Sequence, residues 1–124
     1  MRLLLVCVGG ALGTGARFLL GGWAARTFGP AFPFGTLIIN SLGSFLIMLI
    51  MGLSLEKGLI PADARLFLTT GMMGGFTTYS TFNYETIRLF ADGSTGFALL
   101  YLGGTVFGCL AAGLLAFGLL RLLP

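Results

Sequence analysis

Apolar and polar positions divide the chain into four long apolar runs separated by short polar segments. The runs cover residues 3–25, 33–55, 62–90 and 95–123. Each run is near or above the ~20 residues that cross the hydrocarbon core of a bilayer as a helix. The connecting segments are rich in Gly, Pro and charged residues, and they are too short to form an extramembrane domain. The pattern predicts one all-α membrane domain over 1–124 with four transmembrane helices.

The third run is the least regular of the four. One helix over 62–90 would be about 44 Å long, well beyond the ~30 Å hydrocarbon core. Residues 71–83 contain three glycines together with Thr77, Thr78, Ser80 and Thr81. Glycine costs about 1 kcal/mol relative to alanine in a helix, and hydroxyl side chains compete for backbone hydrogen bonds. We therefore expect the third helix to be broken mid-membrane. The break is either an ion site, as in several transporters, or a glycine-packed kink whose hydroxyls bond their own carbonyls.

Composition narrows the function classes. The mean hydropathy is +1.01 and 9% of residues are charged, against about 25% in soluble domains. Seven Lys/Arg against four Asp/Glu are too few and too scattered for nucleic-acid binding. Because the chain has no histidine, catalysis by histidine and metal ligation by histidine are excluded. Cys7 and Cys109 lie in apolar runs without a CxxC neighbour, so buried structural thiols are expected. No enzyme is predicted.

Glycines recur at a spacing that lets transmembrane helices approach closely. The pairs four residues apart are Gly9/Gly13, Gly71/Gly75 and Gly104/Gly108. They predict a tightly packed bundle. Because four spans bury little surface by themselves, we also expect an oligomer.

The positive charges are almost balanced across the predicted membrane. With four spans, both termini lie on one side. That side would carry Arg2, Lys57, Arg65 and Arg121, and the other would carry Arg17, Arg26 and Arg88. Because Lys/Arg asymmetry sets orientation, so small an imbalance favours insertion in both orientations and an antiparallel pair over one fixed topology.

Several polar residues fall inside the predicted spans. Arg17 would attract anions at a pore mouth, or would pair with an acid or cap a helix end. Asn40 is suited to interhelical bonding, or to lining or bracing a pore. Glu85 and Arg88 are three residues apart and could pair locally.

A second set of candidates has helical spacing. Tyr79, Phe82 and Glu85 share one face of a helix resuming after the break; such a stripe is usually core, but it could line a path. Tyr101 and Thr105 are one turn apart and would extend a polar track or bond a neighbouring helix.

Three motifs together resemble the CrcB/Fluc fluoride channel family over nearly the whole chain. They are GGALGTGAR at 9–17, FGTLIINSLGSF at 34–45 and GGFTTYSTF at 74–82. The second and third are specific, and the glycine row of the first is not. The departure is Tyr79, where the family more often has phenylalanine.

The resemblance implies a passive, fluoride-selective channel that exports cytoplasmic fluoride through two pores of an antiparallel homodimer in the inner (plasma) membrane, surrounded by lipid. It implies a central structural Na⁺ held by the backbone carbonyls of Gly74 and Thr77. The vestibule at Arg17 is expected from the position of that residue in the first run. The fluoride pore residues implied are Asn40, Tyr79, Ser80, Thr81, Phe82, Glu85, Tyr101 and Thr105.

Two other functions remain open. A small dual-topology multidrug-type transporter would need a carboxylate within the first span, and residues 3–25 contain none. A glycine-rich assembly subunit without transport of its own would use Asn40 and the Thr/Ser cluster only for partner binding.

Overall fold

A computed structural model describes all 124 residues, and its regular elements are all helical. Three helices are long and apolar enough to cross a membrane: α1 (Arg2–Phe28), α2 (Phe34–Leu55) and α6 (Thr95–Leu122). Each overlaps one of the predicted apolar runs. The expectation of an all-α membrane protein is therefore confirmed.

The remaining run is divided. Its elements are α3 (Ala62–Leu66), the π-helix η1 (Phe67–Met73), α4 (Gly74–Phe76) and α5 (Tyr79–Ala91). Between α4 and α5 the backbone is extended, with φ −81° and ψ 156° at Thr77 and φ −151° and ψ 114° at Thr78. No pattern in the sequence predicted the π-helix η1. π-Helical turns are rare in proteins, and those that occur are often found at functional sites.

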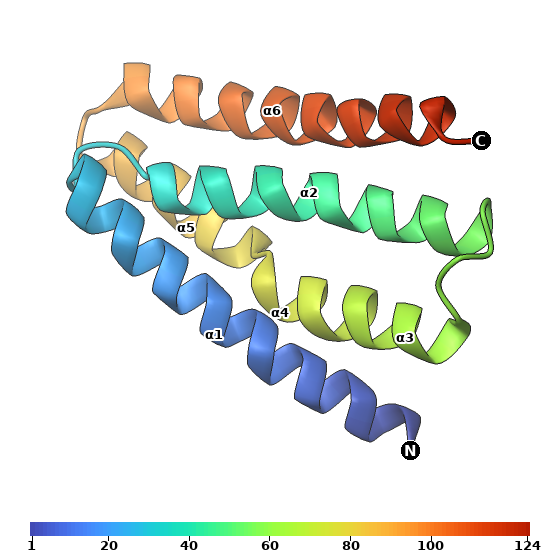
Figure 1. Cartoon of the computed structure of the whole chain (residues 1–124). Helices are drawn as coiled ribbons and strands as arrows, with labels where there is room; N and C mark the ends of the chain where they lie inside the picture. Colours follow the sequence, from blue (N-terminus) through green and yellow to red (C-terminus); the bar gives the residue numbers. More distant parts are fainter.

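Helix α2 lies at the centre of the bundle (Figure 1). It packs along α6 on one side, while α1 crosses it obliquely on the other and packs mainly on η1 and α4. α5 packs against α6 rather than against α1. The N- and C-termini and the α2–α3 loop lie at one end of the bundle, and the α1–α2 and α5–α6 loops lie at the opposite end.

Glycines allow α1 to touch η1 and α4 backbone to backbone. A Cβ at Gly9 would stand 2.6 Å from Phe67 O and 3.1 Å from the Gly71 Cα, and a Cβ at Gly13 would collide with Met72 O. The predicted rows at 9/13 and 71/75 thus face each other within one chain. On α6, Gly104 has no neighbour within 4 Å, and a Cβ at Gly108 would lie 3.5 Å from the Ser41 Oγ of α2, so this row makes no backbone-to-backbone contact of that kind inside the subunit.

Little of the chain is buried within the subunit. Only 20 of 124 residues are buried, and the contiguous apolar core is Ile39, Met73 and Phe76. Many large apolar side chains point outward, among them Leu3, Phe18 and Phe107. An outward apolar surface of this extent matches lipid or a partner rather than water.

Two expectations about individual side chains were wrong. Cys7 is exposed and Cys109 is half-buried, because Cys7 lies on a face of α1 that no other helix of the subunit covers. Arg88 Nη2 pairs with Asp92 Oδ1 at 3.6 Å and not with Glu85, whose carboxylate faces into the bundle.

Candidate functional site

The break between α4 and α5 is held by the side chain of Asn40. The Asn40 amide donates to Thr78 O at 2.9 Å, and the Thr78 N–H donates to Asn40 Oδ1 at 2.8 Å. Both residues are buried. An amide side chain has the donor and the acceptor needed to pair a peptide on both sides. Asn40 thus supplies the hydrogen bonds that the helical ladder no longer provides, and braces the break.

The threonines at the break complete its backbone bonding. Thr77 Oγ1 donates to Met73 O at 2.9 Å, which ends the first helical stretch. Thr78 is the N-cap of α5, because its Oγ1 accepts from the Thr81 N–H at 3.3 Å. In an unbroken helix the Thr78 N–H would bond to Gly74 O. Because that N–H is directed to Asn40 instead, the Gly74 carbonyl loses its usual helical donor.

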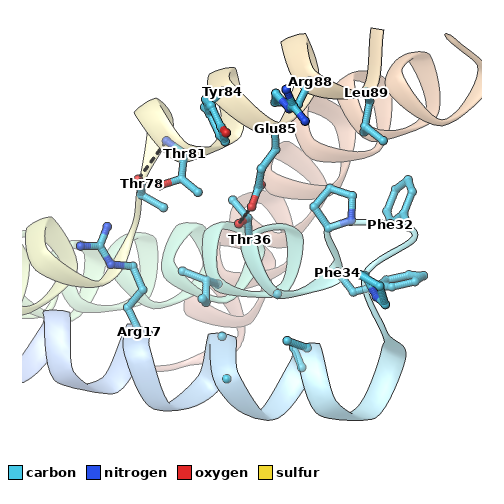
Figure 2. A pocket seen from close by; sticks show the side chains of 18 of the residues that line it. Arg17, Phe32, Phe34, Thr36, Thr78, Thr81, Tyr84, Glu85, Arg88 and Leu89 are labelled. Carbon is cyan, nitrogen blue, oxygen red and sulfur yellow. Dashed lines mark hydrogen bonds between the residues drawn. The ribbon is translucent and has the colours of Figure 1, made fainter. Parts of the chain in front are cut away.

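A cavity of about 600 Å³ lies on the α1 side of the break; we call it the α1-side cavity. Figure 2 shows Arg17 extending from α1 toward Thr78. Thr81 and Glu85 belong to α5, on the other side of the cavity. Arg17 is half-buried and makes no ion pair or hydrogen bond with any protein group. Arg88, paired with Asp92, and Glu85 also line this cavity, so the attraction for an anion is local to the unpaired Arg17 guanidinium.

A second cavity, of about 340 Å³, lies between the break, α2 and α6; we call it the α6-side cavity. Its lining includes Asn40, Tyr79, Phe82, Thr105 and Cys109. No residue that lines it carries a formal charge. Thr78 lines both cavities, so the braced peptide at the break forms part of the wall between them.

Glu85 links three helices beside the α1-side cavity. Its Oε1 accepts from Thr36 Oγ1 of α2 at 3.0 Å, and its Oε2 accepts from the Tyr101 hydroxyl of α6 at 2.6 Å. Hydrogen bonds to carboxylates are short and are stronger than neutral ones. These two bonds fix where the α5 carboxylate points, and Figure 2 shows it directed at Thr36.

Aromatic rings connect the break to this carboxylate. The Tyr79 and Phe82 ring centroids are 5.7 Å apart, and those of Phe82 and Tyr101 are 5.2 Å apart, each pair edge to face. Phe82 and Tyr101 are buried, whereas 78% of Tyr79 is exposed. The Tyr79 ring therefore stands on the subunit surface at the break, with no second protein layer over it.

The predicted site residues are distributed unevenly. Asn40, Thr77, Tyr79, Phe82 and Thr105 line the α6-side cavity, while Arg17, Thr81 and Glu85 line the α1-side cavity. Tyr101 is fully buried and reaches the site through Glu85. Ser80 and Gly74 are exposed and line neither cavity.

The sequence reasoning missed Thr36, Thr78 and Cys109 as site residues. Thr36 lies one turn before Asn40, and Ser44 lies one turn after it, which places a polar row on one face of α2. That spacing could have identified Thr36. The role of Thr78 as the residue held by Asn40 depends on the register between α2 and the break, which no local pattern reports.

The fold and the site define a helical membrane protein with polar cavities at an interrupted helix. Residues 4–118 match the family described as "CrcB-like protein, Camphor Resistance (CrcB)". The chain belongs to this family.

Relatives align over most of the chain and carry the name "Fluoride-specific ion channel FluC". The protein from Anaeromyxobacter dehalogenans is 58% identical over 97% of this chain and 95% of its own length. The protein from Thermus thermophilus is 52% identical over 86% of this chain and 83% of its own. The protein from Geobacter metallireducens is 47% identical over 90% of each.

Proposed function

We propose that this chain is the subunit of a fluoride-selective channel that lets cytoplasmic fluoride leave the cell passively. The observation that carries the proposal is the uncharged, hydrogen-bonding α6-side cavity at a helix break braced by Asn40. The names of the relatives support fluoride as the ion. A channel function, rather than an enzymatic one, agrees with the names of the relatives in the CrcB-like family.

The chemistry of the cavity suits a small, strongly hydrated anion. A filter must replace the water of such an ion with closely spaced donors. The Thr105 hydroxyl and the second N–H of the Asn40 amide are available donors, and the ring edges of Tyr79 and Phe82 carry partial positive charge. A lining without fixed positive charge lets the ion leave again. Arg17 would concentrate anions in a vestibule before they reach it.

We propose further that the interrupted third segment crosses the membrane, giving four spans with the break near the midplane. α5 has 13 residues, about 20 Å of helix, which falls short of the ~30 Å core. The stretch from α3 to α4 is similarly short, so neither part crosses alone. Backbone outside a helix is tolerated at that depth where it is buried or lines a cavity, as Thr78 does.

An antiparallel homodimer in the plasma membrane, with two pores, is the assembly we propose. The nearly balanced Lys/Arg distribution favours both orientations. The exposed Tyr79 ring at the break also favours it. A second copy crossing at the break would cover that ring and close the α6-side cavity.

The break also suits the Na⁺ that the family resemblance implies. The Gly74 carbonyl lacks its helical donor and the Thr77 peptide is extended, so both oxygens are free hard ligands of the kind that an alkali cation takes at a broken helix. Two copies would contribute two such sets to one ion, which would join the subunits. If Na⁺, compared with a larger organic cation, raises the unfolding temperature of the purified dimer, the assignment stands; equal stability in both refutes it.

Fluoride efflux from liposomes tests the proposed function. Purified protein should release fluoride rapidly and chloride far more slowly, without a proton gradient. Release that requires a proton gradient would point to a coupled transporter instead. No release of either anion from liposomes that contain intact dimers would favour an assembly subunit.

A further inference from the structure

Cys109 opens into the α6-side cavity. It lies one turn after Thr105 on α6, and both residues line that cavity with Asn40. The Cys109 Sγ is 3.9 Å from Ser41 Oγ of α2, and the side chain is half-buried. The thiol is therefore neither sealed in a core nor fully exposed on the outer surface of the subunit. Cys7, by contrast, is exposed on α1 and lines neither cavity.

Thr105 indicates independently that this cavity holds a small guest. Its side chain is 6% exposed, and its Oγ1 is the one buried side-chain oxygen or nitrogen without a hydrogen-bond partner. A buried polar group left unpaired is costly, so such groups usually have a partner. A cavity of 340 Å³ is roughly ten times the ~30 Å³ that one water molecule occupies in the liquid.

We propose that Cys109 is a modification site for small thiol-directed species, which reach it through the α6-side cavity, and that an occupied Cys109 obstructs that cavity. The chemical class is a soft monovalent cation such as Ag⁺ or a small neutral methanethiosulfonate. Thiolate is a soft ligand and a nucleophile, whereas every other group around Thr105 and Asn40 is a hard oxygen, a nitrogen or an apolar side chain, except for the Met73 thioether.

Both reactions balance with the reagents named. With Ag⁺, the S–H bond breaks, an S–Ag bond forms and the proton goes to water. With methyl methanethiosulfonate, the Cys109 sulfur forms a disulfide with the methylthio group. The S–S bond of the reagent breaks, and methanesulfinate leaves as the thiol proton is released. Neither step needs a further oxidant.

Mass spectrometry of the intact protein tests access without reference to transport. The Cys7→Ser variant retains only Cys109, and Cys109→Ser retains only Cys7. In folded Cys7→Ser protein, methyl methanethiosulfonate should modify Cys109, whereas a maleimide carrying a long polyethylene glycol chain should react only after unfolding. A Cys109 that stays unmodified by the small reagent, or that reacts equally with the large one before unfolding, overturns the proposal.

Obstruction is tested by transport and rests on the proposed function. In chloride-free liposomes, Ag⁺ or the small reagent should remove most of the fluoride flux of Cys7→Ser and leave the flux of Cys109→Ser unchanged. Equal inhibition of both variants, or full flux after complete modification of Cys109, overturns the proposal. If untreated Cys7→Ser protein moves no fluoride, the proposed function fails, while the mass measurement still decides whether Cys109 is reached.

Discussion

Asn40 and Thr78 are joined by two hydrogen bonds that run in opposite directions, 2.9 Å from the amide to Thr78 O and 2.8 Å from Thr78 N to the amide oxygen. A residue of α2 thereby replaces the helical ladder of the third segment at the point where it is interrupted. The interruption is held by the bundle and is not a local accident of glycine content.

Replacing Asn40 with Asp should suppress fluoride flux. A carboxylate can still accept from the Thr78 N–H, but it cannot donate to Thr78 O, and its charge opposes an anion at low dielectric. The buried carbonyl left unpaired should cost about 1–3 kcal/mol of stability. Flux in liposomes and the dimer fraction of the same preparation measure the two effects. Asn83→Asp is the matched control, since the exposed Asn83 side chain on α5 lines neither cavity. Unchanged flux per dimer in Asn40→Asp would contradict a bracing role.

Gly13→Ala should destabilise the subunit, whereas Gly15→Ala on the same helix should not. A Cβ at Gly13 would overlap the Met72 carbonyl, while a Cβ at Gly15 meets nothing within 4 Å. Forcing an atom into a packed backbone contact costs typically about 1–3 kcal/mol, and alanine otherwise favours a helix. Thermal unfolding in detergent compares the two. Equal unfolding temperatures would mean that α1 does not pack on η1 as described.

Glu85→Ala should leave the buried Tyr101 hydroxyl without its acceptor and cost about 1–3 kcal/mol. Adding Tyr101→Phe to Glu85→Ala should recover part of that loss, because both partners are then removed. Chemical unfolding of the wild type, both single variants and the double variant measures the coupling. Tyr84→Phe is the control, because the Tyr84 side chain is exposed on α5, the helix that carries Glu85. Strictly additive losses would show that the 2.6 Å bond contributes no coupling.

Tyr79→Phe should conduct at a rate similar to the wild type, while Tyr79→Ile should nearly abolish flux. Phenylalanine keeps the positive ring edge and isoleucine removes it. Because 78% of Tyr79 is exposed within the subunit, the isoleucine change costs the isolated chain little packing. Phe82→Ile should also lose flux, but the Phe82 ring is buried, so its variant needs a stability measurement beside the flux. If Tyr79→Ile loses flux only in proportion to lost dimer, the ring serves packing and does not face the ion.

Cysteines placed at the two ends of the bundle should each be labelled from both sides of the membrane. In a Cys7→Ser, Cys109→Ser background, Ser94→Cys marks one end and Glu56→Cys marks the other. Neither the Ser94 nor the Glu56 side chain makes a hydrogen bond to the protein, so both substitutions should disturb the structure little. Labelling of intact cells with an impermeant reagent, before and after permeabilisation, measures the fraction of each orientation. Labels from opposite single faces would exclude the antiparallel dimer.

The sequence by itself determined the class of the protein and its apolar segments. The bilayer requires about 20 apolar residues per span, and runs 3–25, 33–55 and 95–123 meet that requirement without reference to any neighbour. The weak helical propensity around Gly74–Phe76 and Thr77 is likewise local, because glycine and β-branched residues act through their own backbone.

Only the tertiary structure decided which side chains meet. In the packed bundle, Glu85 accepts hydrogen bonds from Thr36 and Tyr101 and does not pair with Arg88. Asn40 is hydrogen-bonded to Thr78, Cys7 is exposed, and Cys109 lines a cavity. In a soluble helix, the alternation of apolar and polar faces reports which side is buried. In a membrane helix both lipid and protein interior are apolar, so that periodicity is nearly lost. The register between helices is then set by close glycine contacts and a few hydrogen bonds, and these exist only once the helices are packed.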